Sequence, residues 1–218
     1  MSAMLFRDLR IVYRDPRGWL ASLIFFALFL SIFAIALDGE PERLAENAAS
    51  AIWLGTIFSL MISFENIFDR DIQTGHFEQL SLSGINALSI VVSKMITGFI
   101  TILLPILIVI PLAGILFNTE PAASAGIMMS VLFGAPALIA YSILSAALLA
   151  GQRNTGFLMI LISLPFIVPV IIFALSGVAS YAEVGFWNTG FQALCGISII
   201  ALTISIPAAA AALSTHLE

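Results

Sequence analysis

The chain has 218 residues, of which 61% are hydrophobic and only 10% are charged. A soluble domain carries about 25% charged residues, so this composition excludes a soluble globular protein and indicates an integral membrane protein. The length suits several helical spans in a single transmembrane domain, residues 1–218, without a large soluble core. The net charge of −5 is less informative than where the cations lie along the chain.

The first 18 residues alternate arginines with apolar residues at helical spacing. This pattern predicts an amphipathic helix at the membrane surface, with its arginines facing water and lipid headgroups. The apolar set is Leu5, Phe6, Leu9, Val12 and Tyr13, and the basic set is Arg7, Arg10, Arg14 and Arg17. A basic flank that only fixes the orientation of the protein is the alternative.

Six apolar segments are each long enough to cross a bilayer, which predicts an all-α membrane protein with six transmembrane helices. We expect these spans at residues 19–37, 48–64, 87–117, 122–150, 157–177 and 191–213. The first segment resembles a secretory signal but is longer than a signal's apolar core of about 7–15 residues, so we interpret it as a retained span. Prolines predict a kink or break at six positions within the spans, namely Pro105, Pro111, Pro136, Pro165, Pro169 and Pro207.

The cations predict the orientation. If the N-terminus is cytoplasmic, the inner side holds Arg7, Arg10, Arg14, Arg17, Arg70, Lys94 and Arg153. The outer side then holds only Arg43 among several acidic residues. Because cytoplasmic loops are enriched in lysine and arginine, we expect both termini in the cytoplasm.

The sequence offers no catalytic chemistry. It has no glycine-rich phosphate-binding loop around its only lysine, Lys94. Its two histidines lie far apart, and no cluster has the spacing of a metal site. No span has an ionisable residue near its centre, which argues against an ion-coupled carrier. Glu65 and Lys94 lie near the same ends of their spans, where they either pair or reach the interface separately. These absences predict a non-catalytic subunit, without a nucleic-acid partner, that is driven by another protein.

The polar segment 64–82, FENIFDRDIQTGHFEQLSL, separates the second and third spans. Phe68 and Ile72 are one helical step apart among charged residues, and Gly75 suits a helix end because it tolerates positive φ. A second apolar set follows at Phe77 and Leu80. We predict two short amphipathic helices that lie flat on the membrane, present a charged face to the cytoplasm and dock a partner. A solvated loop is the alternative.

This segment resembles the coupling segment of ABC-2-type export permeases, and more closely that of the CcmB family, the haem exporter permease of cytochrome c maturation. The resemblance rests on Glu65, Phe68, Asp71, Gly75, Glu78, Gln79 and Leu80. The stretch GEPERLAENAASAIW (residues 39–53) also looks like the family's outer loop, and the length and number of spans agree. The chain departs from the family at Ser83-Gly84-Ile85-Asn86, where prolines are usual.

The resemblance implies a permease subunit of an ABC-type complex in the bacterial inner membrane, acting in haem handling or export for c-type cytochrome biogenesis. A separate ATP-binding subunit would dock on residues 64–82, in an assembly of two permeases and two ATPases. The coupling residues would be Glu65, Phe68, Asp69, Arg70, Asp71, Gly75, Phe77, Glu78, Gln79 and Leu80.

Further partners implied by the resemblance are a haem-handling membrane protein, a small membrane peptide and a periplasmic haem chaperone. No bound cofactor is expected; ATP belongs to the partner subunit, and haem is a possible cargo. The ATP is used either to move haem or to release the loaded chaperone, and the lack of histidine, a common haem ligand, in the spans favours the second. An ABC-2 permease for another cargo, a partner-independent secondary carrier and a scaffold are the alternatives.

Overall fold

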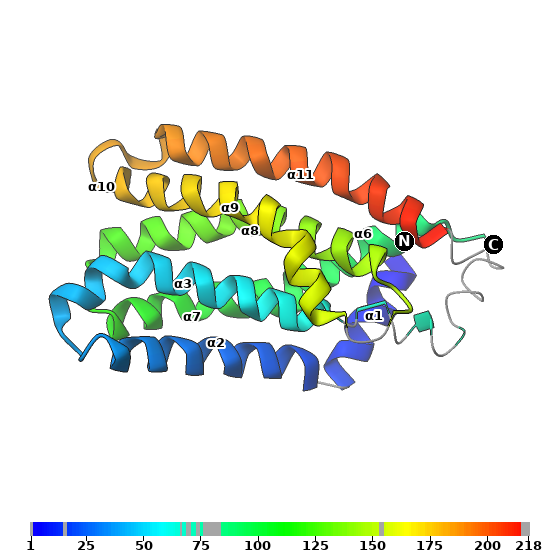
Figure 1. The fold of residues 1–218 in the computed structure, drawn as a ribbon, viewed down its shortest axis with the longest axis horizontal. Helices are drawn as coiled ribbons and strands as arrows, with labels where there is room; N and C mark the ends of the chain where they lie inside the picture. The colour runs from blue at the N-terminus through cyan, green and yellow to red at the C-terminus, as the bar shows by residue number, and fades with distance from the viewer. Residues whose placement is uncertain are drawn as a thin grey trace.

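The computed structural model describes residues 2–14, 17–65, 67–68, 71–72, 75, 84–152 and 155–214. Its regular elements are all helices, and the long ones run side by side as a bundle (Figure 1). Six are long and apolar enough to cross a membrane: Gly18–Ala36, Pro41–Phe64, Ala87–Leu116, Pro121–Leu148, Gly156–Ala179 and Thr189–Ser214. This confirms the predicted all-α fold with six spans.

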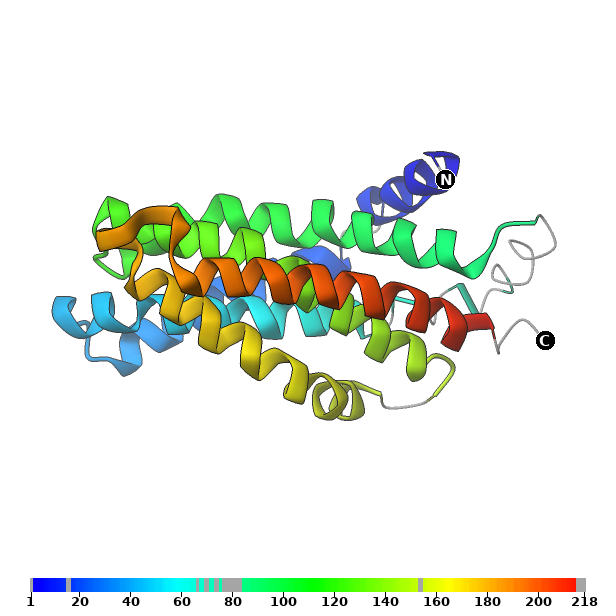
Figure 2. The same ribbon diagram turned by 90° about the horizontal axis from the view of Figure 1, so that it is seen from above.

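The chain opens with α1 (Ser2–Arg14), which is followed by α2 (Arg17–Ala36). α1 packs mainly against the first part of the third span and stands off the main bundle, as Figure 2 shows. The outward side of α2 consists of large apolar residues, including Ile24, Leu28, Ile32 and Ile35, which are exposed. Such a surface is suited to lipid rather than water.

The second span, α3 (Pro41–Phe64), begins seven residues before the expected start at residue 48. Pro41 is well placed in the first turn, where its missing N–H is not needed. Leu44 and Ala48 are one helical step apart and both buried, so the acidic stretch that looked like a loop has a packed face. Trp53 in the middle of α3 is completely buried.

The third span changes helix type along its length. It comprises α6 (Ala87–Gly98), the π-helical turn η1 (Phe99–Leu103) and α7 (Leu104–Leu116). The side chain of Asn86 caps its start by accepting a hydrogen bond from the Ser89 N–H at 2.9 Å. Within η1 the Leu104 N–H donates to the Phe99 carbonyl, five residues earlier. Pro105 follows directly, and because it has no N–H, the normal ladder is interrupted there.

The second half of the bundle contains α8 (Pro121–Leu148), α9 (Gly156–Ala179) and α11 (Thr189–Ser214), with α10 (Tyr181–Val184) and the 3₁₀ turn η2 (Gly185–Trp187) between the last two. α8 is the central helix and packs against α3, α7, α9 and α11. α7, α8, α9 and α11 all continue through their internal prolines. Among the six prolines, only Pro105 follows a change of helix type, and the other five lie in continuous helices, as neighbouring helices and local adjustments permit.

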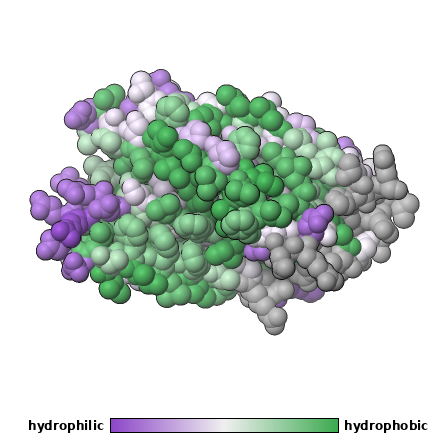
Figure 3. Space-filling view, viewed as in Figure 1, coloured by the Kyte–Doolittle hydropathy of each residue, from purple (hydrophilic) through white to green (hydrophobic). Residues whose placement is uncertain are grey.

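The two ends of the bundle differ. The turn between α2 and α3 forms a hydrophilic patch at one end, and an apolar belt covers the visible middle (Figure 3). The start of α1, the end of α3, the start of α6 and the end of α11 lie together at the opposite end (Figure 1). That second end holds the buried charges described next.

Candidate functional site

The most unusual residue of α1 is Asp8, which lies on the apolar side of the helix. Met4 and Ile11, on the same side, are buried and half-buried, while Arg10 and Arg14 on the other side are exposed. Asp8 is only 2% exposed. A carboxylate is almost never buried without a partner, so its surroundings identify the polar site.

Two carboxylates and two cations meet around Asp8 and form what we call the charge network: Arg7, Asp8, Asp71 and Lys94. Arg7 Nη2 lies 2.8 Å from Asp8 Oδ1 and 3.3 Å from Asp71 Oδ1. Lys94 Nζ lies 2.6 Å from Asp71 Oδ2 and 3.8 Å from Asp8 Oδ1. The formal charges cancel, which suits a site that is largely removed from water.

Ser93 completes the surroundings of Asp8. It is fully buried on α6, and its hydroxyl donates to Asp8 Oδ2 at 2.8 Å. Asp8 Oδ1 is contacted by Arg7 of α1 and Lys94 of α6, and Asp8 Oδ2 accepts the hydrogen bond from Ser93 of α6. The Lys94 side chain is 13% exposed and that of Asp71 8%. Electrostatic attraction is stronger at such a site than at the surface.

The network joins three parts of the chain that are far apart in sequence. Arg7 and Asp8 come from α1, Asp71 from the polar segment 64–82, and Ser93 and Lys94 from α6. Phe64 and Phe68 anchor the start of the polar segment in the core, with exposed fractions of 0% and 1%. The segment is thus tied to the bundle by both apolar and ionic contacts.

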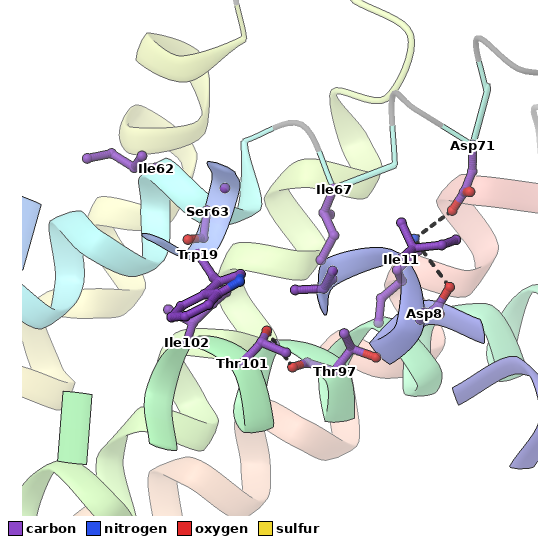
Figure 4. A pocket seen from close by; sticks show the side chains of 14 residues that line it. Asp8, Ile11, Trp19, Ile62, Ser63, Ile67, Asp71, Thr97, Thr101 and Ile102 are labelled. Atoms are coloured by element: carbon purple, nitrogen blue, oxygen red, sulfur yellow. Dashed lines mark hydrogen bonds and ion pairs between the residues drawn. The ribbon is translucent and has the colours of Figure 1, made fainter. Parts of the chain in front are cut away.

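A cavity of about 280 Å³ lies beside the network, between α1, the start of α2, the end of α3 and the third span. Figure 4 shows Asp8 and Asp71 on one side of it, with Trp19 and Ile102 farther along. Thr97 lines the cavity and is 4% exposed, and its Oγ1 has no hydrogen-bond partner among the described residues. Thr101 donates its hydroxyl to the Thr97 carbonyl at 2.8 Å.

Elsewhere in the bundle, neutral hydrogen bonds join neighbouring helices. Trp53 Nε1 donates to Ser130 Oγ at 2.9 Å, and Ser198 donates to the Phe133 carbonyl at 2.6 Å. Such contacts hold helices together in a membrane. No group of three histidine, cysteine or acidic residues suited to a metal ion occurs in the part of the chain that the structure describes.

Several expectations about individual residues need correction. Asp71 was expected on a charged face open to the cytoplasm, but it is 5% exposed and ion-paired. Arg7 was expected to face water, but its side chain is 23% exposed and turned toward the two carboxylates. Lys94 pairs with Asp71 and Asp8, and no ion pair joins it to Glu65. Arg7 and Lys94 face the interior because both contact the buried carboxylate of Asp8.

Other predicted residues are placed without a test of their role. Glu65 is half-buried close to Gly156, and Gly75 has a φ of +64°, which glycine tolerates. Arg10 and Arg14 are exposed. The remaining predicted positions lie outside the described residues or, for Arg17, have no described side chain: Arg17, Asp69, Arg70, Phe77, Glu78, Gln79 and Leu80.

Sequence reasoning missed Asp8 and Ser93, and it left open whether Lys94 pairs with Glu65 or reaches the interface separately. A signal for Asp8 was present, because it is the one acidic residue within the apolar stripe of α1. A charge in such a stripe indicates either a misassigned helix or a buried partner. The chain's only lysine was the natural candidate for that partner.

Comparison with known proteins agrees with this architecture. The family model described as CcmB protein matches residues 1–216. Heme exporter protein B of Rhodobacter capsulatus is 30% identical over 218 residues, covering 100% of both chains. Heme exporter protein B of Haemophilus influenzae is 30% identical over 97% of this chain and 96% of its own. That of Bradyrhizobium diazoefficiens is 28% identical over 100% of this chain and 99% of its own. The match along nearly the whole length, together with the six spans, shows that the chain belongs to the CcmB family.

Proposed function

We propose that this chain is the permease subunit of an ABC-type export complex that acts in haem handling or export for c-type cytochrome biogenesis. Its family membership over residues 1–216 and the names of its full-length relatives support this. The chain forms one transmembrane domain and does not itself hydrolyse ATP. A separate ATP-binding subunit supplies the energy by docking on residues 64–82.

The observation that carries the coupling proposal is the ion pair between Asp71 and Lys94, at 2.6 Å. Asp71 belongs to the segment proposed to receive the ATPase, and Lys94 belongs to the third span. Arg7 Nη2, 3.3 Å from Asp71 Oδ1, adds α1 to the same connection. A movement imposed on the segment would therefore reach two helices at once.

The physical reason is that a buried ion pair resists separation. Removing one partner of such a pair typically costs about 3–5 kcal/mol, because the other charge stays buried and uncompensated. The completely buried ring of Phe64 adds packing that the segment's start would lose if it moved alone. Segment, α1 and α6 would thus shift together rather than slide past one another.

We further propose that the charge network lies at the cytoplasmic side of the bacterial inner membrane and that both termini are cytoplasmic. The positive-inside rule supports this, since Arg43 is the only cation expected at the opposite end. A cysteine placed at Glu42 should react with an impermeant maleimide in intact spheroplasts, and one at Gly75 only after permeabilisation. The reverse pattern would invert the orientation.

The proposed assembly contains a second copy of this chain and two ATPase subunits. A haem-handling membrane protein, a small membrane peptide and a periplasmic haem chaperone would complete it. Haem is the proposed cargo, and no residue of this chain is assigned as its ligand.

The test of the function is to delete the gene and follow covalently attached haem. Membranes and periplasm of the deletion strain should lose haem-stained c-type cytochromes, while b-type cytochromes, whose haem is not covalently attached, serve as the control and should remain. Re-expression of this chain should restore the stained bands. Normal c-type cytochromes in the deletion strain, or equal loss of both types, would contradict the proposal.

A further inference from the structure

A second hollow lies on the membrane-facing side of α1, and we call it the α1 groove. It has a volume of about 590 Å³. Most of its wall is apolar and comes from α1, α2 and the third span: Phe6, Leu9, Tyr13, Trp19, Ile100 and Pro105. Phe6 and Tyr13 are 72% and 85% exposed, so the groove is open rather than filled by the protein's own side chains.

The π-helical turn shapes one wall of this groove. Ile100 and Thr101 of η1 line it, together with Pro105 just beyond. π-helical turns inside α-helices occur frequently at functional sites, because they displace side chains from the regular helical positions. Here the turn and α1 line the same groove.

The groove differs from the cavity beside the charge network, although the two share a wall. Val12, Trp19 and Thr101 line both hollows. The cavity has two carboxylates and an ammonium group in its lining, whereas the described lining of the groove has one charged residue, Arg10. Besides Arg10, the polar groups of the described groove lining are the hydroxyls of Tyr13 and Thr101 and the indole N–H of Trp19, and the Thr101 hydroxyl already donates to the Thr97 carbonyl.

Arg10 determines which charge a molecule bound in the groove should carry. It is exposed and has no ion pair with any described residue, and neither has Arg14 one turn further along. The carboxylate of Asp8 is directed to the opposite side, toward Arg7, Ser93 and Lys94. Among the described residues, no carboxylate pairs with the positive charge at the rim of the groove, which lies above an apolar floor.

We propose that the α1 groove binds one anionic phospholipid, with an acyl chain along the apolar wall and the phosphate against Arg10. Exposed large apolar residues of the third span, Leu104 and Ile108, continue from the groove toward the hydrocarbon, so an acyl chain enters without crossing a polar surface. Arginine is well suited to phosphate because its planar group donates several hydrogen bonds. Basic pockets between transmembrane helices bind anionic headgroups in the same way.

Tryptophan fluorescence gives a direct test, because Trp19 lines the groove. The chain has three tryptophans; Trp53 is fully buried and Trp187 is 76% exposed at the other end of the chain's fold. In a Trp187→Phe variant reconstituted in bilayers, phosphatidylglycerol or phosphatidylcholine with brominated chains is titrated in as the quencher. We expect the groove to bind phosphatidylglycerol about five times more tightly than phosphatidylcholine, which corresponds to the attraction between one basic residue and an anionic membrane surface.

The matched variants are Arg10→Gln and Arg14→Gln, which remove the same charge from the same helix. Arg10→Gln should abolish the preference for phosphatidylglycerol, and Arg14→Gln should retain most of it, because Arg14 does not line the groove. Equal quenching by the two lipids in the parent would overturn the proposal. So would an equal loss in both variants, since that would indicate general attraction of α1 to anionic membranes.

Discussion

At the scale of single residues, the charge network depends on Lys94. It is the only lysine of the chain, and its ammonium group contacts both buried carboxylates, Asp71 at 2.6 Å and Asp8 at 3.8 Å. Arg7 contacts the same two carboxylates from the side of α1. The formal charges of these four residues balance, so the loss of any one removes a contact from a buried group of opposite charge.

Lys94→Met should lower the stability of the protein by about 3–5 kcal/mol, because Asp71 stays buried and loses the ammonium group 2.6 Å from its carboxylate. The measurement is reversible unfolding in mixed detergent micelles. Adding Asp71→Leu to Lys94→Met should recover a large part of the loss, since it removes the stranded charge.

The control for this prediction is Arg43→Gln. Arg43 Nε lies 4.0 Å from Glu40 Oε2, but both side chains are more than half exposed, at 60% and 64%. An exposed pair of this kind contributes about 0–1 kcal/mol, so the change should be small. If Lys94→Met and Arg43→Gln proved equally mild, the charge network would not be a stabilising contact.

The residues of the charge network could be predicted from the sequence only in part. The sequence placed Lys94 and Glu65 at the same ends of neighbouring spans, and it left open whether they pair or reach the interface separately. The true partner, Asp71, lies within the polar segment, and Asp8 lies 86 positions before Lys94. Helical spacing reveals which face a residue occupies, but not which distant helix that face meets. For that reason the burial of Asp8 was needed to find the network.

At the scale of elements, the closest approach near the site is that of α3 to α6. Gly98 is the last residue of α6, and a Cβ atom added there would meet the ring of Phe64 at the end of α3. Phe64 is completely buried and cannot move toward solvent. The absence of a side chain at Gly98 therefore allows the polar segment to begin beside the third span.

Gly98→Ala should destabilise the protein by about 1–3 kcal/mol, the usual cost of overpacking a core. Gly196→Ala on α11 is the matched control, because a Cβ there meets no atom within 4 Å. Alanine is the better helix former, so this control should be neutral or stabilising by up to about 1 kcal/mol. Unfolding temperatures of both variants test the difference.

A compensating substitution separates packing from other causes. Phe64→Leu removes ring atoms that the new methyl group would meet, so Gly98→Ala should be less harmful in a Phe64→Leu background. If the two substitutions were simply additive, the contact between α3 and α6 would not explain the effect.

Element boundaries show where sequence patterns are insufficient. The acidic residues at 38–47 predicted a loop, yet α3 starts at Pro41 because Leu44 and Ala48 supply a buried face between the acids. Six prolines predicted a kink or break each, and the described helices change type only before Pro105 and are continuous at the other five. Proline removes a donor at every position, but the surrounding helices determine whether the backbone departs from the α conformation.

At the scale of the whole molecule, apolar runs of about 20 residues fix the number of spans, because a bilayer permits few other structures. These apolar segments do not determine which helices pack against one another. The central position of α8, for example, follows from small buried residues such as Gly126, Ser130 and Gly134 that let neighbouring helices approach.

We propose above all that a partner ATPase drives this permease through residues 64–82. It is tested most directly by isolating the tagged chain from native membranes in mild detergent and identifying the subunits that accompany it. We expect an ATP-binding subunit with the unmodified chain and with the control Glu42→Ala at the opposite end. We expect the double variant Glu78→Ala, Leu80→Ala to release it. No ATPase with the unmodified chain, or undiminished ATPase with the double variant, would contradict the account.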